Sequence, residues 1–182
     1  MTDLIPITAL GSQSAQQVSF GALTISEEPE LGIASFTLRA GHDAPIVCGM
    51  TLPEVGKLTQ KGGDFAFWSA PNQWMIIGAG QGTGDFAAKI KAKAPDATVS
   101  DQTDGFASFS IRGDQEKLEQ MMTKLVNLPP DAYAVGCATR TGMEHMTVFL
   151  VREDESSLLV LGPRSFAGSI WHALGTAARR LT

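Results

Sequence analysis

Apolar and polar positions alternate along much of the chain, which predicts short β-strands. Ala34, Phe36 and Leu38 would lie on one face of such a strand, with hydroxyl side chains on the other. Phe106–Ile111 alternates in the same way. Thr98–Ser100 and the apolar segment Ile46–Thr51 are further short candidates. The chain is therefore expected to contain several half-buried strands of antiparallel type.

A hairpin followed by a helix is predicted in the first half of the chain. The apolar runs Phe65–Trp68 and Trp74–Ile77 are separated by the turn formers of residues 69–72. A glycine-rich stretch follows, and Asp85 can cap a short helix that Pro95 ends.

The middle of the chain predicts a strand and helix over residues 105–127, and then a buried strand. Asp114 is the expected N-cap of the helix, and Pro129–Pro130 ends it. Met143–Val151 is predicted as a strand that is apolar on both faces from Met146 onward, a pattern typical of a buried position in the sheet.

The tail repeats the hairpin and helix. Leu158–Leu161 is followed by a Gly162–Pro163 break, and Ser165 is the expected cap of the last helix. The apolar stripe of that helix is predicted to be Phe166, Ile170, Trp171, Leu174, Ala177, Ala178 and Leu181. Repeated strand-turn-strand-helix units, at 65–94 and 146–180, indicate an α+β fold with ferredoxin-like halves.

Length and composition favour one folded domain. The chain has 182 residues, of which 43% are hydrophobic, enough for a substantial core. Residues 1–20 lack periodicity and are predicted to form an extended N-terminal arm. Residues 21–182 are predicted to form a single α+β domain of two pseudo-similar halves.

Charge and hydropathy limit the kinds of partner that the chain can bind and the cell compartment in which it is expected. The net charge is −5 and no Lys/Arg cluster resembles a phosphate-binding stripe, so no nucleic-acid partner is expected. No apolar run is long enough for a membrane span, and the N-terminus lacks the pattern of a secretory signal. Cys48 and Cys137 are interpreted as reduced thiols, with a disulfide between them as the alternative. The expected location is cytoplasmic.

One short motif suggests a nucleotide. Gly82–Ala87 fits GxGxxA, and Asp101 follows at the distance seen in dinucleotide-binding folds. Extra residues between the strand and the first glycine, and a carboxylate at Asp85, argue against pyrophosphate binding there. A connection between strand and helix is the favoured interpretation, with nucleotide binding as the alternative.

The remaining candidate groups predict no catalytic, cofactor-binding or metal site. His42, His145 and His172 show no metal-ligand spacing. Carboxylate pairs such as Glu27–Glu28 are interpreted as solvated loop charges. Asp101 and Asp104 are interpreted as parts of an Asx turn, with a ligand or partner contact as the alternative.

Three residues are predicted as possible interface residues. Arg164 lies at a helix start, where an unpaired cation is mildly unfavourable. It is interpreted as a solvated surface residue, with pairing to a carboxylate across a fold contact or a subunit boundary as the alternative. Trp171 and Trp74 supply large apolar area, which suits either a core or a binding surface.

Five segments together resemble a known family. They are Asn72–Ile77, Val99–Gly105, Asn127–Pro129, Gly136–Thr141 and Arg164–Trp171. In order and spacing they resemble the gamma subunit of heterotetrameric sarcosine oxidase, over roughly residues 20–182. Gly113-Asp114 departs from the family's Gly-Pro or Gly-Ala, although Asp opens a helix equally well.

The resemblance implies a fold similar to the folate-binding domain of glycine-cleavage aminomethyltransferases. It also implies an accessory, non-catalytic subunit of a complex that demethylates sarcosine oxidatively to glycine, forming hydrogen peroxide and methylene-tetrahydrofolate. The implied partners are the alpha, beta and delta subunits. FAD, FMN, NAD, tetrahydrofolate and zinc would be bound by those subunits and none by this chain.

Two other functions remain open at this point. One is a stand-alone tetrahydrofolate-binding or one-carbon transfer module, suggested by fold analogy. The other is a nucleotide-binding protein that uses Gly82–Ala87. The residues do not distinguish sarcosine from a related N-methyl amine as the substrate of the complex.

Overall fold

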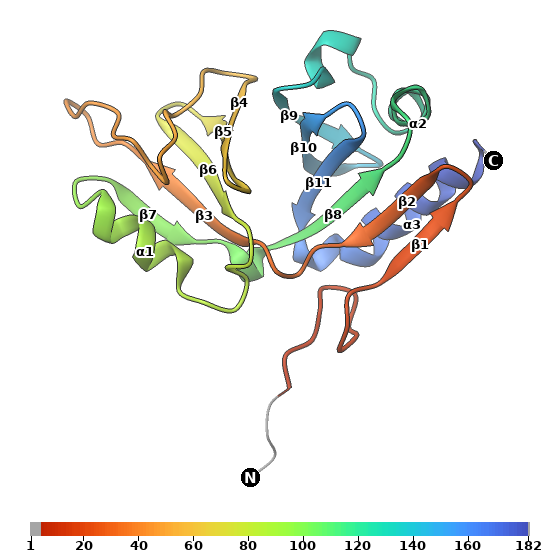
Figure 1. The fold of residues 1–182 in the computed structure, drawn as a ribbon, viewed down its shortest axis with the longest axis horizontal. Coiled ribbons are helices and arrows are strands. Elements are labelled where there is room, and N and C mark those ends of the chain that lie inside the picture. Colours follow the sequence, from red (N-terminus) through yellow and green to blue (C-terminus); the bar gives the residue numbers. More distant parts are fainter. Residues whose placement is uncertain (1–4, 182) are drawn as a thin grey trace.

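The chain forms two antiparallel sheets that pack face to face, and the computed structural model describes residues 5–181. In Figure 1 the sheets open from each other like a V, with the helices outside. The strands are β1 (Gln17–Phe20), β2 (Leu23–Glu27), β3 (Gly32–Thr37), β4 (Leu58–Lys61), β5 (Asp64–Ala70), β6 (Gln73–Gly78), β7 (Thr98–Asp101), β8 (Phe106–Arg112), β9 (Cys137–Met143), β10 (Met146–Asp154) and β11 (Ser157–Pro163).

Three α-helices and three short 3₁₀ turns complete the fold. The helices are α1 (Phe86–Lys93), α2 (Gln115–Leu125) and α3 (Ala167–Arg179), and the turns are η1 (Thr103–Gly105), η2 (Pro130–Tyr133) and η3 (Arg164–Phe166). The units β5-β6-α1 and β10-β11-α3 confirm the predicted repeat of hairpin and helix, and with it the α+β class.

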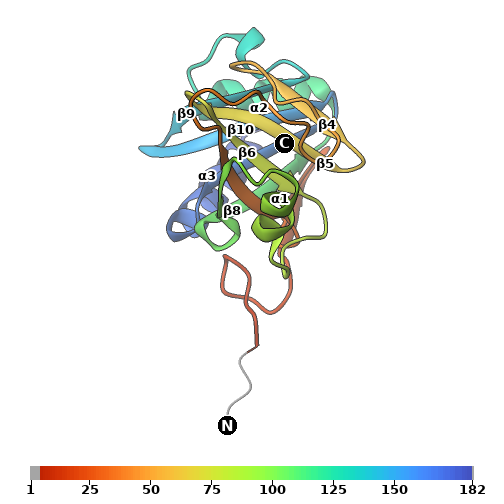
Figure 2. The ribbon, with the colours of Figure 1, turned by 90° about the vertical axis from the view of Figure 1, so that its left-hand side faces the viewer.

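The larger sheet has six strands in the order β1-β2-β8-β11-β10-β9, and the smaller has five in the order β4-β5-β6-β3-β7. Helices α2 and α3 cover the outer face of the large sheet, and α1 covers that of the small sheet. Figure 2 shows α1 and the small sheet in front of the large sheet, with the N-terminal segment projecting below.

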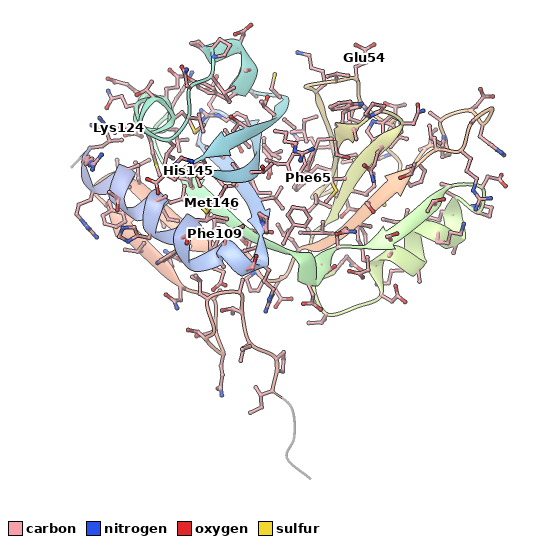
Figure 3. All side chains as sticks on the ribbon, turned by 180° about the vertical axis from the view of Figure 1, so that it is seen from behind. Glu54, Phe65, Phe109, Lys124, His145 and Met146 are labelled. Carbon is pink, nitrogen blue, oxygen red and sulfur yellow. The ribbon has the colours of Figure 1, made fainter. Side chains whose placement is uncertain are left out.

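Alternation along each central strand divides its side chains between two cores. In β10, Val148 and Leu150 pack toward α2 and α3, whereas Phe149 and Val151 face the small sheet. This two-sided burial confirms the buried position in the sheet that was predicted for the strand. Figure 3 shows Phe65 between the two halves and Phe109 within the half that contains α3.

The two sheets are also joined by backbone hydrogen bonds at one pair of edges. Leu58 N donates to the Gly136 carbonyl at 3.0 Å, and Ala138 N donates to the Gly56 carbonyl at 3.2 Å. These bonds connect the start of β4 with the start of β9. The contact also covers part of both edge strands. Unpaired strand edges can pair with another chain and so favour aggregation, and this contact reduces the length of edge that is open to such pairing.

Two predictions of local strands were wrong. The strand predicted over Met143–Val151 is broken by a hairpin turn, in which Glu144 and His145 have φ angles of 45° and 68°. Both angles belong to the left-handed region that tight hairpins require. Ile46–Thr51 is not a strand and contains only a bridge from Val47 to Met50.

The start of the last helix also differs from the prediction. Ser165 lies within η3 and does not cap α3, whose first turn follows directly from that 3₁₀ turn. Phe166 is 45% exposed and therefore does not belong to the core stripe. The tighter 3₁₀ geometry rotates Phe166 away from the face on which Ile170 and Leu174 are buried.

The segment predicted as an arm contains a strand. Its last four residues form β1, the edge strand of the large sheet, with Val18 opposite Ile25. Residues 1–4 lie outside the described part of the chain.

Candidate functional site

A cavity lies where the two sheets meet, and we call it the junction cleft. Its volume is about 420 Å³. Residues 6–9 and 13–15 line one side, and the crossing from β2 to β3 at residues 27–33 lines another. The start of β8, the loop at Gly82 and Thr83, and Arg164 complete the wall. The cleft therefore gathers segments that are far apart in the sequence.

Glu27 is the buried carboxylate of this cleft. It is 4% exposed, and its two oxygens accept hydrogen bonds from Leu10 N at 3.0 Å and Gln16 N at 3.2 Å. The interpretation of Glu27 as a solvated loop charge was therefore wrong. It ends β2 on the same face as Leu23 and Ile25, so strand alternation buries it.

Replacing Glu27 with alanine is expected to release residues 8–16 from the sheet. The two amides would lose their acceptors, at a cost of about 1–2 kcal/mol in unfolding free energy. Hydrogen exchange at Leu10 and Gln16 is the direct measurement, and both amides should exchange faster in the variant. Glu30→Ala is the matched control because Glu30 is exposed nearby. Unchanged exchange in Glu27→Ala would contradict this role.

Arg164 extends from η3 to the same N-terminal segment. Its Nη2 donates to the Ile7 carbonyl at 3.0 Å, and its Nη1 lies 3.9 Å from Asp104 Oδ1. The structure therefore favours the alternative interpretation of Arg164, pairing with a carboxylate, as a contact within the fold. The Asp104 side chain is 98% exposed, so solvent screens this ion pair and the pair adds little to stability. Its main effect is to orient the Arg164 side chain.

The turn at η1 contributes Thr103 and Asp104 to the wall of the cleft. Asp101 Oδ1 accepts a hydrogen bond from Thr103 N at 2.7 Å, which confirms the predicted Asx turn. The Thr103 hydroxyl accepts a hydrogen bond from Ile33 N at 3.0 Å. These bonds connect the crossing between β7 and β8 to the first residues of β3.

The loop with the GxGxxA pattern has a structural explanation. A Cβ at Gly82 would meet the carbonyl oxygen of Pro29, so glycine is needed for close packing of two backbone segments. Asp85 caps α1, as predicted, by accepting a hydrogen bond from Ala88 N at 2.8 Å. Its carboxylate thereby occupies the helix N-terminus that a phosphate would need.

The two tryptophans predicted as interface residues lie away from the junction cleft. Trp74 is half-buried, and its Nε1 donates to the Pro53 carbonyl at 2.8 Å. Trp171 is also half-buried, with its ring centroid 5.7 Å from that of Phe109. The structure thus brings Arg164 to the cleft and leaves both tryptophans on separate cores.

Other groups able to carry chemistry are dispersed. Within residues 5–181, no three His, Cys, Asp or Glu side chains gather as a possible metal site. Both cysteines are free, and burial raises the pKa of the Cys48 thiol. None of the helices in this range has the length and apolar character needed to cross a membrane.

Two solved structures have an architecture similar to that of this chain. No protein-family model and no curated protein matches the sequence. A chain of the heterotetrameric sarcosine oxidase from Corynebacterium sp. U-96, solved in complex with pyrrole 2-carboxylate, superposes with a TM-score of 0.73 at 19% identity. The match covers 90% of this chain and 87% of that one. The two chains share one fold.

The glycine cleavage system aminomethyltransferase T from Bartonella henselae has the same arrangement in part of its length. Its TM-score is 0.57 at 14% identity, and the match covers 84% of this chain but 48% of the aminomethyltransferase. The chain therefore spans about half of that protein. Both likenesses confirm the predicted fold class, including its relation to the aminomethyltransferase domain.

Proposed function

We propose that the protein is an accessory, non-catalytic subunit of a sarcosine oxidase-type complex, in the position of its gamma subunit. The observation that supports this most is the extent of the structural match. Nearly the whole chain corresponds to nearly the whole of a chain from heterotetrameric sarcosine oxidase, at 90% and 87% coverage. The aminomethyltransferase, by contrast, contains as much again outside the match.

The contacts in the junction cleft support an accessory role. Glu27 and Arg164 each use their side chain to hold another segment of this chain. We assign FAD, FMN, NAD, tetrahydrofolate and zinc to the alpha, beta and delta subunits of a cytoplasmic complex. Sarcosine, or a related N-methyl amine, would be its substrate.

Co-expression with those three subunits tests the assignment. We expect this chain to co-elute with an affinity-tagged alpha subunit at one copy per complex, measured by native mass spectrometry. Omitting the chain should lower the yield of assembled complex while leaving the flavin content of the large subunits intact. Elution of this chain as a separate monomer would contradict the proposal.

The proposed contact residues can be tested in the same experiment. Arg164, Trp171 and Trp74 are the predicted interface residues, and Arg164 is the one whose charge can be reversed without opening a core. We expect Arg164→Glu to reduce co-elution, whereas Arg140→Glu, an exposed change on β9, serves as the control. Equal recovery of both variants would remove Arg164 from the interface.

A tetrahydrofolate-binding or one-carbon transfer module is the second candidate. The likeness to part of an aminomethyltransferase and the cleft of about 420 Å³ favour it. Calorimetry of the isolated chain with tetrahydrofolate separates the two functions. Heat of binding would support the module, and its absence at millimolar ligand would contradict it.

A further inference from the structure

The lining of the junction cleft carries an excess of negative charge. Among the described residues that line it, four are carboxylates and one is a cation, namely Glu27, Glu28, Glu30 and Asp104 against Arg164. Arg164 already donates to a backbone carbonyl and lies beside Asp104. The other three carboxylates have no cationic nitrogen within 4.0 Å among residues 5–181.

Glu27 is the buried part of this negative charge. Its side chain is 4% exposed, and both of its hydrogen bonds come from backbone amides, which supply no full positive charge. Carboxylates buried to this extent are seldom left without a cation, because their removal from water is costly. A positively charged group in the cleft would reduce that cost.

Ser108 supplies a hydroxyl on the wall of the same cleft. Its side chain is 6% exposed and lies on the opposite face of β8 from Phe109, which packs under the helices. Its Oγ forms no hydrogen bond within the described part of the chain, yet it is accessible to water, unlike the unpaired Oγ of Ser69. Because buried hydroxyls nearly always have a partner, this Oγ points to a group bound in the cleft.

Glu28 places a free acceptor near this hydroxyl. Its backbone N donates to the Ser108 carbonyl at 2.9 Å, so the two residues are neighbours on adjacent segments. Its Oε1 accepts a hydrogen bond from Ser110 Oγ at 2.6 Å, whereas its Oε2 has no partner among residues 5–181 and is accessible to water. Ser108 and Ser110 share one face of β8, so the Glu28 carboxylate lies on the same face as the free hydroxyl.

The rest of the wall suits a hydrocarbon chain. Leu31, Ile33 and Phe106 line the cleft together with these polar groups. The volume of about 420 Å³ lies within the range of about 300–1,000 Å³ that is usual for small-ligand sites. The cleft thus combines apolar surface, free oxygen atoms and uncompensated negative charge.

We propose that the junction cleft binds a primary ammonium group carried on an alkyl chain. The ammonium group would donate hydrogen bonds to Glu28 Oε2 and Ser108 Oγ, and its charge would compensate Glu27. The methylene groups would pack against the apolar wall. An ammonium group is compact, and its three donors can reach oxygens on different segments. An anion would be repelled by the unpaired carboxylates, and a neutral ligand would leave them uncompensated.

Titration of the full chain with matched five-carbon ligands tests the site. The probes are 1,5-diaminopentane, pentanoate and pentyltrimethylammonium, which has the charge but no N–H donor. Binding is measured by calorimetry and by the amide chemical shifts of Gly82 and Phe106, which line the cleft. We expect the diamine to bind about tenfold or more tightly than either other probe, because each of these lacks the charge-assisted hydrogen bonds.

A further probe identifies the source of the ammonium group. Nα-acetyl-lysine amide presents the lysine side chain as a partner protein would, without the charges of a free amino acid. Tighter binding of 1,5-diaminopentane would support a free polyamine as the natural ligand. Binding of the blocked lysine at least as tightly as the diamine would support a lysine side chain of a partner protein.

Two variants connect the binding to the named residues. Glu28→Gln keeps an acceptor for Ser110 but removes the charge, and we expect about tenfold weaker binding of the diamine. Ser108→Ala should weaken it about threefold without loss of stability, because the hydroxyl has no hydrogen bond to lose. Glu54→Gln is the matched control, since Glu54 is exposed at the opposite end of the molecule from the N-terminal segment (Figure 3).

Three results would overturn the proposal. One is the absence of heat and of shift changes with both primary amines at tens of millimolar. The second is binding of pentanoate or pentyltrimethylammonium as tight as that of the diamine. The third is undiminished binding in folded Glu28→Gln. The test uses the chain alone, so its outcome does not depend on assembly with other subunits.

Discussion

Replacing Phe67 with alanine is expected to lower the free energy of unfolding by about 3–5 kcal/mol. Phe67 is fully buried in the core between the two sheets. Its ring lies 5.1 Å from that of Phe149 on the large sheet and 6.5 Å from that of Phe65 beside it. Truncation would remove the central member of this aromatic group and leave a cavity that two rigid sheets cannot readily fill.

Denaturant unfolding followed by circular dichroism is the measurement for Phe67→Ala. Phe166→Ala is the matched control because the same exchange there removes a ring that is 45% exposed. The control should change stability by less than about 1 kcal/mol. Similar midpoints for the two variants would show that the sheets do not depend on this packing.

Replacing Gly82 with alanine is expected to destabilise the protein by about 2–3 kcal/mol. The added Cβ would meet the Pro29 carbonyl oxygen and lie 2.9 Å from the Cα of Glu30. Both are backbone atoms, so relief requires the loop or the crossing between the sheets to move. Gly82 N also donates to the Glu30 carbonyl at 2.9 Å, and that bond would be strained.

The loss of stability in Gly82→Ala is measured by thermal unfolding in the absence of nucleotide. Gly84→Ala is the control from the same motif, because its Cβ would make an ordinary contact 3.5 Å from Lys89 Nζ. A stable Gly82→Ala variant with altered response to NAD would instead support the nucleotide-binding alternative. Destabilisation of Gly82→Ala alone would support close packing as the reason for this glycine.

Strong alternation made the central strands predictable, and weak alternation hid the edge strands. β3 and β8 place buried apolar side chains at alternating positions, and the hairpin β5-β6 contains two apolar runs split by a turn, so the sequence indicates all four strands directly. β1, β4 and most of β9 are polar and half-exposed, and their conformation comes from hydrogen bonds to a neighbouring strand. Such pairing leaves little trace in the sequence of the edge strand itself.

Two buried charged residues were missed for one shared reason. Glu27 follows Leu23 and Ile25, and Arg152 follows Val148 and Leu150, each at the next position on a buried strand face. Extending the alternation by one step would have marked both as buried. Partners could not be foreseen, because Leu10 and Gln16 approach Glu27 only through the tertiary fold.

The order of the strands in the sequence also affects which of the two sheets can fold first. The small sheet uses one continuous stretch, from β3 to β7, whereas the large sheet joins β2 from near the start of the chain to β8 and the strands after it. During synthesis, every strand of the small sheet leaves the ribosome before β8 does. A small sheet that is already compact draws the ends of β2 and β8 together, which reduces the entropy lost when Ile25 pairs with Ile111.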